Sequence, residues 1–67
     1  MLRGKIKFYN PDKGYGFIVP IDGNEDHFVH ASSLEKGTVL AEGDEVLFES
    51  TIGKVGKRQA INVKLVR

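Results

Sequence analysis

Glycine and proline interrupt this 67-residue chain so often that few segments have room for a helix of ordinary length. Eight glycines and two prolines are spread along it, and the longest stretch without either is residues 24–36. Both residue types mark turns and weaken or break regular helices. A helix over 24–36, with Phe28, Ala31 and Leu34 at three-residue spacing, is the main alternative. The rest of the pattern predicts short strands joined by turns, and therefore an all-β chain.

Five segments have the alternating or apolar character of strands. The predicted strands are residues 2–9, 15–19, 25–30, 45–50 and 59–66. Two of the turns between them, residues 10–14 and 21–24, are rich in asparagine, aspartate and glycine, which favour tight turns. Pro20 is expected to close the second strand, since it has no N–H to donate. Residues 31–34 are expected to form a single helical turn, and residues 51–58 a loop.

Five short strands in so small a chain are expected to close into one barrel over residues 1–67. An open sheet of this size would leave strand edges exposed and its inner face uncovered. Strand alternation gives a predicted core of Ile6, Ile18, Val29, Val46, Phe48, Ile61 and Val63, with Leu65 also inward. These side chains already fill a small barrel, so further large rings would overpack it.

Aromatic residues are concentrated in the first 28 positions. Five of the six lie there: Phe8, Tyr9, Tyr15, Phe17 and Phe28. Because the core is full, several of these rings are expected outside, where proteins seldom leave them without use. Lysines at positions 7 and 13 are interleaved with them. Such a pattern suits unpaired nucleic acid, whose bases stack on rings while lysines follow the phosphates. Duplex DNA is not favoured, because its bases are already stacked and no recognition helix is expected.

The net charge of +1 hides an uneven distribution. Residues 1–20 carry four basic side chains and one acid, residues 21–50 eight acids and one lysine, and residues 51–67 five basic side chains and no acid. If the two basic ends converge in space, one face will attract phosphates. The alternative is that the charges only solvate both faces.

Two segments resemble the ribonucleoprotein motifs of the cold-shock domain family. They are residues 13–18, Lys-Gly-Tyr-Gly-Phe-Ile, and residues 28–30, Phe-Val-His. Residues 4–10 and 42–48 are similar to the first and fourth strands of that family, so the resemblance covers essentially the whole chain. It implies a five-stranded antiparallel OB-fold barrel that binds single-stranded RNA or DNA, often pyrimidine-rich, and acts as an RNA chaperone.

The resemblance also implies a binding face. Its expected residues are Lys7, Phe8, Lys13, Tyr15, Phe17, Asp26, Phe28 and His30. Asp26 is expected either to accept a hydrogen bond from a base edge or to balance nearby lysines. Strict alternation from Ile6 points Phe8 inward, whereas the resemblance places it on the face, so a bulge or strong twist is required between them.

Several positions depart from the family pattern. Phe8 stands where tryptophan is usual, Tyr9 where phenylalanine is usual, and Ala31 replaces an aromatic residue after the histidine. The loop at residues 35–38 is shortened and lacks a phenylalanine. Fewer rings predict a shorter binding site. Lys57 and Arg58 are expected to compensate in part, since guanidinium planes stack and pair with phosphate.

Other classes of site are not expected. Without cysteine there is no disulfide or thiolate metal site, and His27 and His30 face opposite sides of one strand, His27 at a partly buried or rim position. Serines 32 and 33 lack a nucleophile-elbow motif, so no catalytic residue is predicted. We therefore expect no enzyme activity, metal, cofactor or small-molecule substrate.

No signal peptide or membrane span is recognisable, which predicts a cytoplasmic monomer. Two other functions stay open at this point. One is an SH3-like barrel that binds peptides through its exposed rings, and the other is a different OB-type translation or ribosomal component that binds folded RNA.

Overall fold

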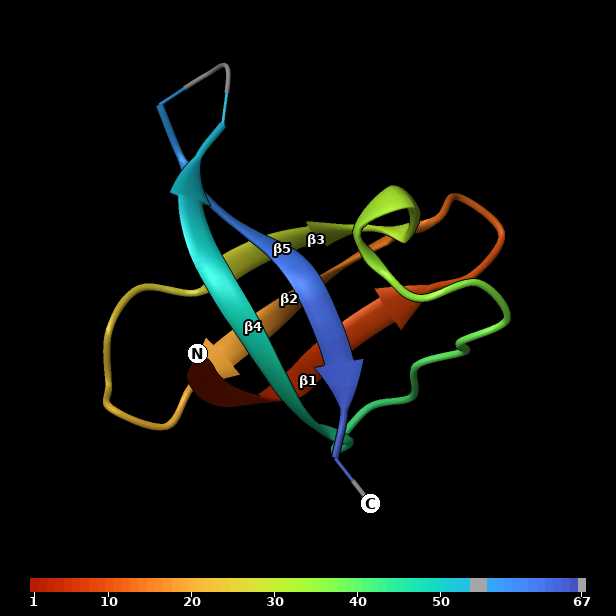
Figure 1. The fold of residues 1–67 in the computed structure, drawn as a ribbon, viewed down its shortest axis with the longest axis horizontal. Coiled ribbons are helices and arrows are strands. Elements are labelled where there is room, and N and C mark those ends of the chain that lie inside the picture. Colours follow the sequence, from red (N-terminus) through yellow and green to blue (C-terminus); the bar gives the residue numbers. More distant parts are fainter. Residues whose placement is uncertain (54–55, 67) are drawn as a thin grey trace.

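The structure, a computed structural model, describes residues 1–53 and 56–66. Within these ranges the chain forms five strands and one short 3-10 helix (Figure 1). In chain order they are β1 (Leu2–Asn10), β2 (Tyr15–Pro20), β3 (His27–His30), η1 (Ala31–Ser33), β4 (Glu45–Ile52) and β5 (Arg58–Leu65). The five strands and the helical turn after residue 30 are confirmed, and Pro20 closes β2 as expected. The alternative helix over residues 24–36 is wrong, because β3 occupies its centre. Residues 54–55 of the expected loop 51–58 lie outside the described ranges.

The strands close into a barrel in the order β1-β2-β3-β5-β4. The predicted five-stranded barrel is confirmed. It departs from a wholly antiparallel arrangement at one pair, β3 with β5, which run parallel through Phe28↔Gln59 and Val29↔Ala60. A closed ring with an odd number of strands cannot alternate in direction throughout, so one parallel pair is unavoidable. In Figure 1 the β4–β5 hairpin crosses in front of β1 and β2.

The core follows the predicted alternation with one exception. Its buried apolar side chains are Ile6, Ile18, Val29, Leu40, Val46, Phe48, Ala60 and Val63. Ile61 was expected inside but is only half-buried, and Ala60 is buried in its place. The pairings Glu49↔Ile61 and Leu47↔Lys64 leave one extra residue on β5, and Asn62 there has a φ of 51°. This bulge shifts the alternation of β5 by one position. Leu40 enters the core from the loop before β4.

A second bulge lies in β1 and decides where the rings go. Ile6 pairs with Ile18 and Phe8 pairs with Phe17, so Lys7 is the extra residue between them. Both Ile6 and Ile18 are buried, whereas Phe8 and Phe17 are exposed. The bulge required to reconcile strand alternation with an outward Phe8 is therefore confirmed.

The described segments contain no helix that is long and apolar enough to span a membrane.

Candidate nucleic-acid interface

Four aromatic rings form one cluster on the outer face of β1, β2 and β3, which we call the ring platform. It consists of Phe8, Tyr15, Phe17 and Phe28. Tyr15 lies at its centre: its ring centroid is 5.9 Å from that of Phe8, 6.4 Å from Phe17 and 5.9 Å from Phe28. The Tyr15 and Phe28 rings are stacked, while the other contacts, including that of Phe17 with Phe28 at 5.9 Å, are edge-to-face. Such pairs hold aromatic rings in fixed orientations.

The outer rings of the platform are open to solvent. Phe8 is 42% exposed and Phe17 is 36% exposed, whereas Tyr15 and Phe28 are half-buried. Tyr9, the fifth ring of the first 28 residues, packs against the core instead. An exposed apolar patch of rings is the chemical surface on which nucleobases stack.

Lys7 and Asp26 are brought together beside the platform. Lys7 Nζ donates a hydrogen bond to Asp26 Oδ2 at 3.1 Å, and both side chains are exposed. An exposed ion pair of this kind contributes at most about 1 kcal/mol. Lys7 is therefore free to exchange this carboxylate for a phosphate, and Asp26 has a further oxygen that can accept from a base edge.

Lys13 lies in the turn that joins β1 to β2, next to the Tyr15 end of the platform. Asn10 Oδ1 accepts hydrogen bonds from the backbone N–H groups of Asp12 and Lys13, at 3.0 and 3.1 Å. The Gly14 amide donates to the Asn10 carbonyl at 2.8 Å. This side-chain cap is the turn chemistry expected of asparagine, and it fixes the backbone at Lys13 while its side chain stays exposed.

A groove of about 520 Å³ continues the platform towards β5. We call it the lateral groove. It is lined by Phe17, Phe28, His30, Ser32, Gly53, Lys57, Arg58 and Gln59. Lys57 and Arg58 thus lie at the same face as the rings, which is the position that their predicted role in binding requires. Ser32, Gly53 and Gln59 were not among the expected site residues. Gln59 reaches the groove through the parallel pairing of β3 with β5, whereas Ser32 lies there because it follows His30 in the short helical turn.

The two histidines of β3 have different surroundings. His30 pairs with Tyr15 across the strands and is exposed at the lateral groove. His27 is only 2% exposed, and its ring lies 5.1 Å from that of Phe48. The expectation of a partly buried or rim position for His27 is therefore wrong. Full burial is possible because Glu25 and Ser50 provide hydrogen-bond partners for both ring nitrogens.

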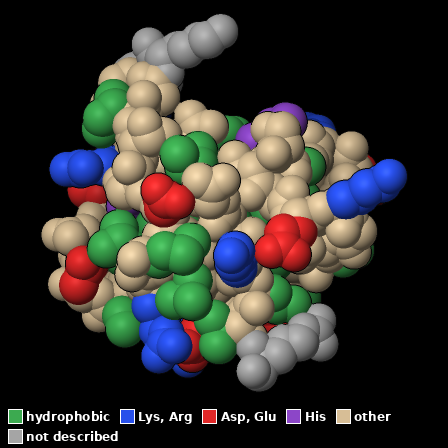
Figure 2. All heavy atoms as spheres, in the orientation of Figure 1, with side chains coloured by type: hydrophobic (Ala, Val, Ile, Leu, Met, Phe, Trp, Pro, Cys, Tyr) green, Lys and Arg blue, Asp and Glu red, His purple; other side chains and the backbone are tan. Residues whose placement is uncertain are grey.

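The basic side chains converge only in part. Lys7 and Lys13 from one end of the chain and Lys57 and Arg58 from the other flank the ring platform and its groove. Arg3 instead pairs with Glu45 at 2.9 Å. On the side of β4 and β5, Figure 2 shows acidic, basic and apolar side chains interspersed. The chain therefore places a group of cations beside the rings without making a whole face basic.

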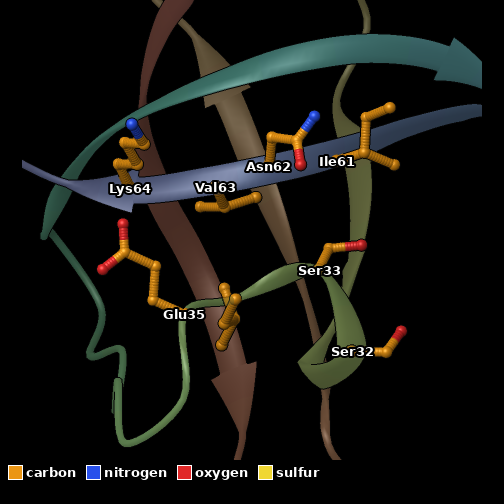
Figure 3. Close-up of a pocket in the computed structure, with 8 residues that line it drawn as sticks. Ser32, Ser33, Glu35, Ile61, Asn62, Val63 and Lys64 are labelled. Carbon is orange, nitrogen blue, oxygen red and sulfur yellow. The ribbon is translucent and has the colours of Figure 1, made fainter.

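A second pocket, of about 340 Å³, lies between η1 and β5. Figure 3 shows Glu35 and Lys64 near one end of it and Ser33 and Asn62 towards the other. Its lining includes no aromatic ring. In the described part of the chain, no group of three or more histidine, aspartate or glutamate side chains is placed to hold a metal ion.

Comparison with known proteins shows to which family this chain is similar. The model of the 'Cold-shock' DNA-binding domain family matches residues 2–66. The chain is 42% identical over 66 residues to the cold shock-like protein CspE of Buchnera aphidicola, with 96% of each chain covered. It is 42% identical over 67 residues to the cold shock-like protein CspC of Escherichia coli K12, covering 97% of this chain and 96% of that one. A solved structure of "drosophila Unr CSD456" superposes with a TM-score of 0.79 at 24% identity, over 98% of this chain and 26% of that one, a similarity of fold.

Proposed function

This chain belongs to the cold-shock domain family, whose members bind single-stranded nucleic acids, and we propose that it binds unpaired RNA or DNA on its ring platform. The observation that carries the proposal is the cluster of four rings on one outer face, two of them more than a third exposed. Soluble proteins seldom leave adjoining aromatic side chains exposed without use, so their outward position favours a binding role.

Stacking supplies most of the binding energy in this proposal. Bases of the strand lie against Phe8, Tyr15, Phe17 and Phe28, at about 1–3 kcal/mol for each stacked base. The existing contacts among the rings support this role, because rings that are already oriented lose little freedom when a base binds.

Phosphates are attracted by the cations around the platform. We assign this role to Lys7, Lys13, Lys57 and Arg58, and Arg58 can also stack on a base. Asp26 either accepts a hydrogen bond from a base edge after Lys7 has left it to bind a phosphate, or it holds the Lys7 side chain in position. His30 contacts the strand in the lateral groove. No catalytic residue, cofactor or nucleotide hydrolysis is part of the proposal.

Binding of this kind opposes secondary structure in RNA. A base that lies on Phe17 or Phe28 is not available for pairing, so the protein shifts the equilibrium of a hairpin towards its open form. This is the proposed chaperone activity. Melting of a labelled hairpin is expected to occur at lower temperature as the protein is added, and no change would contradict it.

The binding site is proposed to be short. Ala31 at the start of η1 and the loop at residues 35–38 carry no ring, so the stacking surface ends near His30. The loss of two stacking rings lowers affinity by about 2–5 kcal/mol. Nanomolar binding of long oligo-dT at physiological salt would contradict a short site. The pyrimidine preference, the monomeric state and the cytoplasmic location stay predictions.

The proposal is tested by titrating the protein with four labelled probes at two salt concentrations. The probes are a pyrimidine-rich hexanucleotide, its duplex, a folded RNA hairpin and a proline-rich peptide. We expect binding of the single strand, weaker at high salt. Preferential binding of the peptide or of the hairpin stem would favour the SH3-like or ribosomal alternative.

Phe17→Ala provides the matching variant. It is expected to lower the affinity for the single strand about 5- to 150-fold, the equivalent of one lost stacking contact. Val39→Ala is the control, since Val39 is 71% exposed in the loop before β4 and takes no part in the platform. The proposal fails if the hexanucleotide does not bind, or if Phe17→Ala binds it as the native protein does.

A further inference from the structure

The two histidines of β3 are hydrogen-bonded in opposite ways. His27 Nδ1 lies 2.9 Å from the backbone carbonyl oxygen of Glu25, which can only accept, so this nitrogen carries the ring proton. Its Nε2 lies 2.8 Å from Ser50 Oγ, and the serine hydroxyl therefore donates to it. Neutral His27 is the Nδ1–H tautomer.

His30 has the reverse arrangement. The backbone N–H of Ser32, which can only donate, points to His30 Nδ1 at 3.1 Å, so this nitrogen carries no proton. Ser32 Oγ lies 2.9 Å from the same nitrogen, so the hydroxyl also donates to it. The proton of the neutral ring must then reside on Nε2.

The Nε2–H group of His30 is left over as a hydrogen-bond donor. It makes no hydrogen bond to any described residue, and the His30 side chain is exposed at the lateral groove. The charged side chains that line this groove with it, Lys57 and Arg58, have only donors and cannot accept a hydrogen bond from Nε2–H. Tyr15, the residue opposite His30 on β2, is engaged in the ring platform.

We propose that Ser32 is a positioning residue of the nucleic-acid site, which holds His30 as the Nε2–H tautomer so that the ring donates a hydrogen bond to an oxygen of the bound strand. The acceptor is a base carbonyl or a phosphate oxygen. The role of the strand rests on the proposed function, whereas the tautomer is a property of the free protein and is tested without any ligand.

The tautomer is measured by NMR of the histidine ring nitrogens in the free protein at pH 8, where an ordinary histidine is neutral. We expect opposite patterns: a protonated Nδ1 for His27 and a protonated Nε2 for His30. His27 serves as the internal reference. If His30 carries its proton on Nδ1, or shows an even mixture, the proposal is overturned whether or not the protein binds nucleic acid.

Three variants separate the effect of Ser32 from that of the helical turn. Ser32→Ala keeps the backbone donor and removes the hydroxyl, so we expect the His30 signals to move towards a mixture of tautomers while those of His27 stay unchanged. Ser32→Thr restores the hydroxyl and the original pattern. Ser33→Ala is the matched control, since Ser33 lies in the same turn but lines only the second pocket. An equal effect of Ser33→Ala would contradict the role of Ser32.

The acceptor on the strand is identified by pairing a variant with modified strands. His30→Asn retains an acceptor for the Ser32 amide, but its shorter side chain places no donor at the position of Nε2. We expect roughly two- to tenfold weaker binding from the lost hydrogen bond. Methylphosphonate linkages remove a charged phosphate oxygen, and difluorotoluene replaces thymine without its carbonyl groups. The partner is the modification that weakens binding to the native protein but not to His30→Asn.

If the strand binds and no modification is coupled to His30 in this way, the donor role is wrong. If no strand binds at all, the proposed function fails together with the donor role, while the NMR result still decides the role of Ser32 in the free protein.

Discussion

Gly16 lies between two rings of the platform and has no room for a side chain. A Cβ built there would collide with the carbonyl oxygen of Phe8 and lie 2.9 Å from the Cα of Tyr9. Both obstacles belong to the backbone of β1, which cannot move without disturbing the bulge. The close approach of β1 and β2 at this point keeps Phe8 and Phe17 side by side.

Gly16→Ala is therefore expected to destabilise the fold by about 3 kcal/mol, the upper part of the range for overpacking. In a chain of this size that lowers the Tm by more than about 10 °C. Gly37→Ala is the control: no atom lies within 4 Å of its Cβ, and only its φ of +85° opposes a side chain, at about 1–2 kcal/mol. Thermal unfolding of both variants is the measurement, and a smaller loss for Gly16→Ala than for Gly37→Ala would contradict this explanation.

Ser50 is the partner that allows His27 to be buried. Ser50→Ala removes the hydroxyl that donates to Nε2 of buried His27, and we expect a loss of about 1–3 kcal/mol in the free energy of unfolding. Urea unfolding at pH 8 measures it, with Ser33→Ala as a serine variant that breaks none of these contacts. Unchanged stability of Ser50→Ala would show that His27 finds another partner or water.

At the scale of elements, the bulge in β1 turns the strand so that its two neighbouring rings serve different purposes. Beyond Lys7, Phe8 joins the platform and Tyr9 packs against the core. If the strand ran on through Ile6, Lys7 and Phe8 without a bulge, period-two alternation would send Phe8 inward and Tyr9 outward.

Deletion of Lys7 joins Ile6 directly to Phe8, so period-two alternation still points Phe8 outward, and we expect the variant to fold and to keep single-strand binding. Lys7→Ala keeps the bulge and loses only the exposed pair with Asp26, so its stability should change by less than about 1 kcal/mol. Circular dichroism and the hexanucleotide titration compare the two variants. A deletion variant that unfolds, or that binds the hexanucleotide much more weakly than Lys7→Ala does, would show that alternation from Ile6 does not set the ring orientation.

The sequence predicts the elements well where alternation and turn residues agree. The five strands and the turn at Asn10 follow from local patterns. The prediction that Ile61 lies in the core is wrong, because the left-handed conformation of Asn62 shifts the alternation of β5. No local pattern in the sequence marks a bulge at this asparagine.

The missed residues of the site have a common cause. Gln59 enters the lateral groove through the pairing of β3 with β5, and Leu40 enters the core from an irregular loop. These contacts join parts of the chain that are far apart in sequence, so period and turn chemistry do not reveal them. The outward position of Phe8 was reached through the family resemblance, since alternation alone predicts the opposite.

For the whole molecule, binding should depend on a small number of cations. Among the described residues, Lys7, Lys13, Lys57 and Arg58 flank the platform, and these four cations can neutralise about four phosphates. For single strands the slope of log K against log salt is about −0.7 per phosphate, which predicts a slope of roughly −2 to −3.

Lys57→Ala is expected to flatten this slope by about 0.7. Lys64→Ala, a variant of a lysine that lines the second pocket, should leave it unchanged. Titrations at four salt concentrations provide the slopes. An equal effect of the two variants would mean that the charge of the whole molecule, not the cations beside the rings, attracts the strand.

The central claim is that unpaired bases stack on Phe8, Tyr15, Phe17 and Phe28. An NMR titration of the native protein with a pyrimidine-rich hexanucleotide tests it most directly. We predict upfield ring-current shifts of the base protons, with the largest protein shifts at these four rings and in the adjoining lateral groove. Binding with the largest shifts around Ser33, Glu35 and Lys64 at the second pocket, and the four rings unmoved, would contradict it.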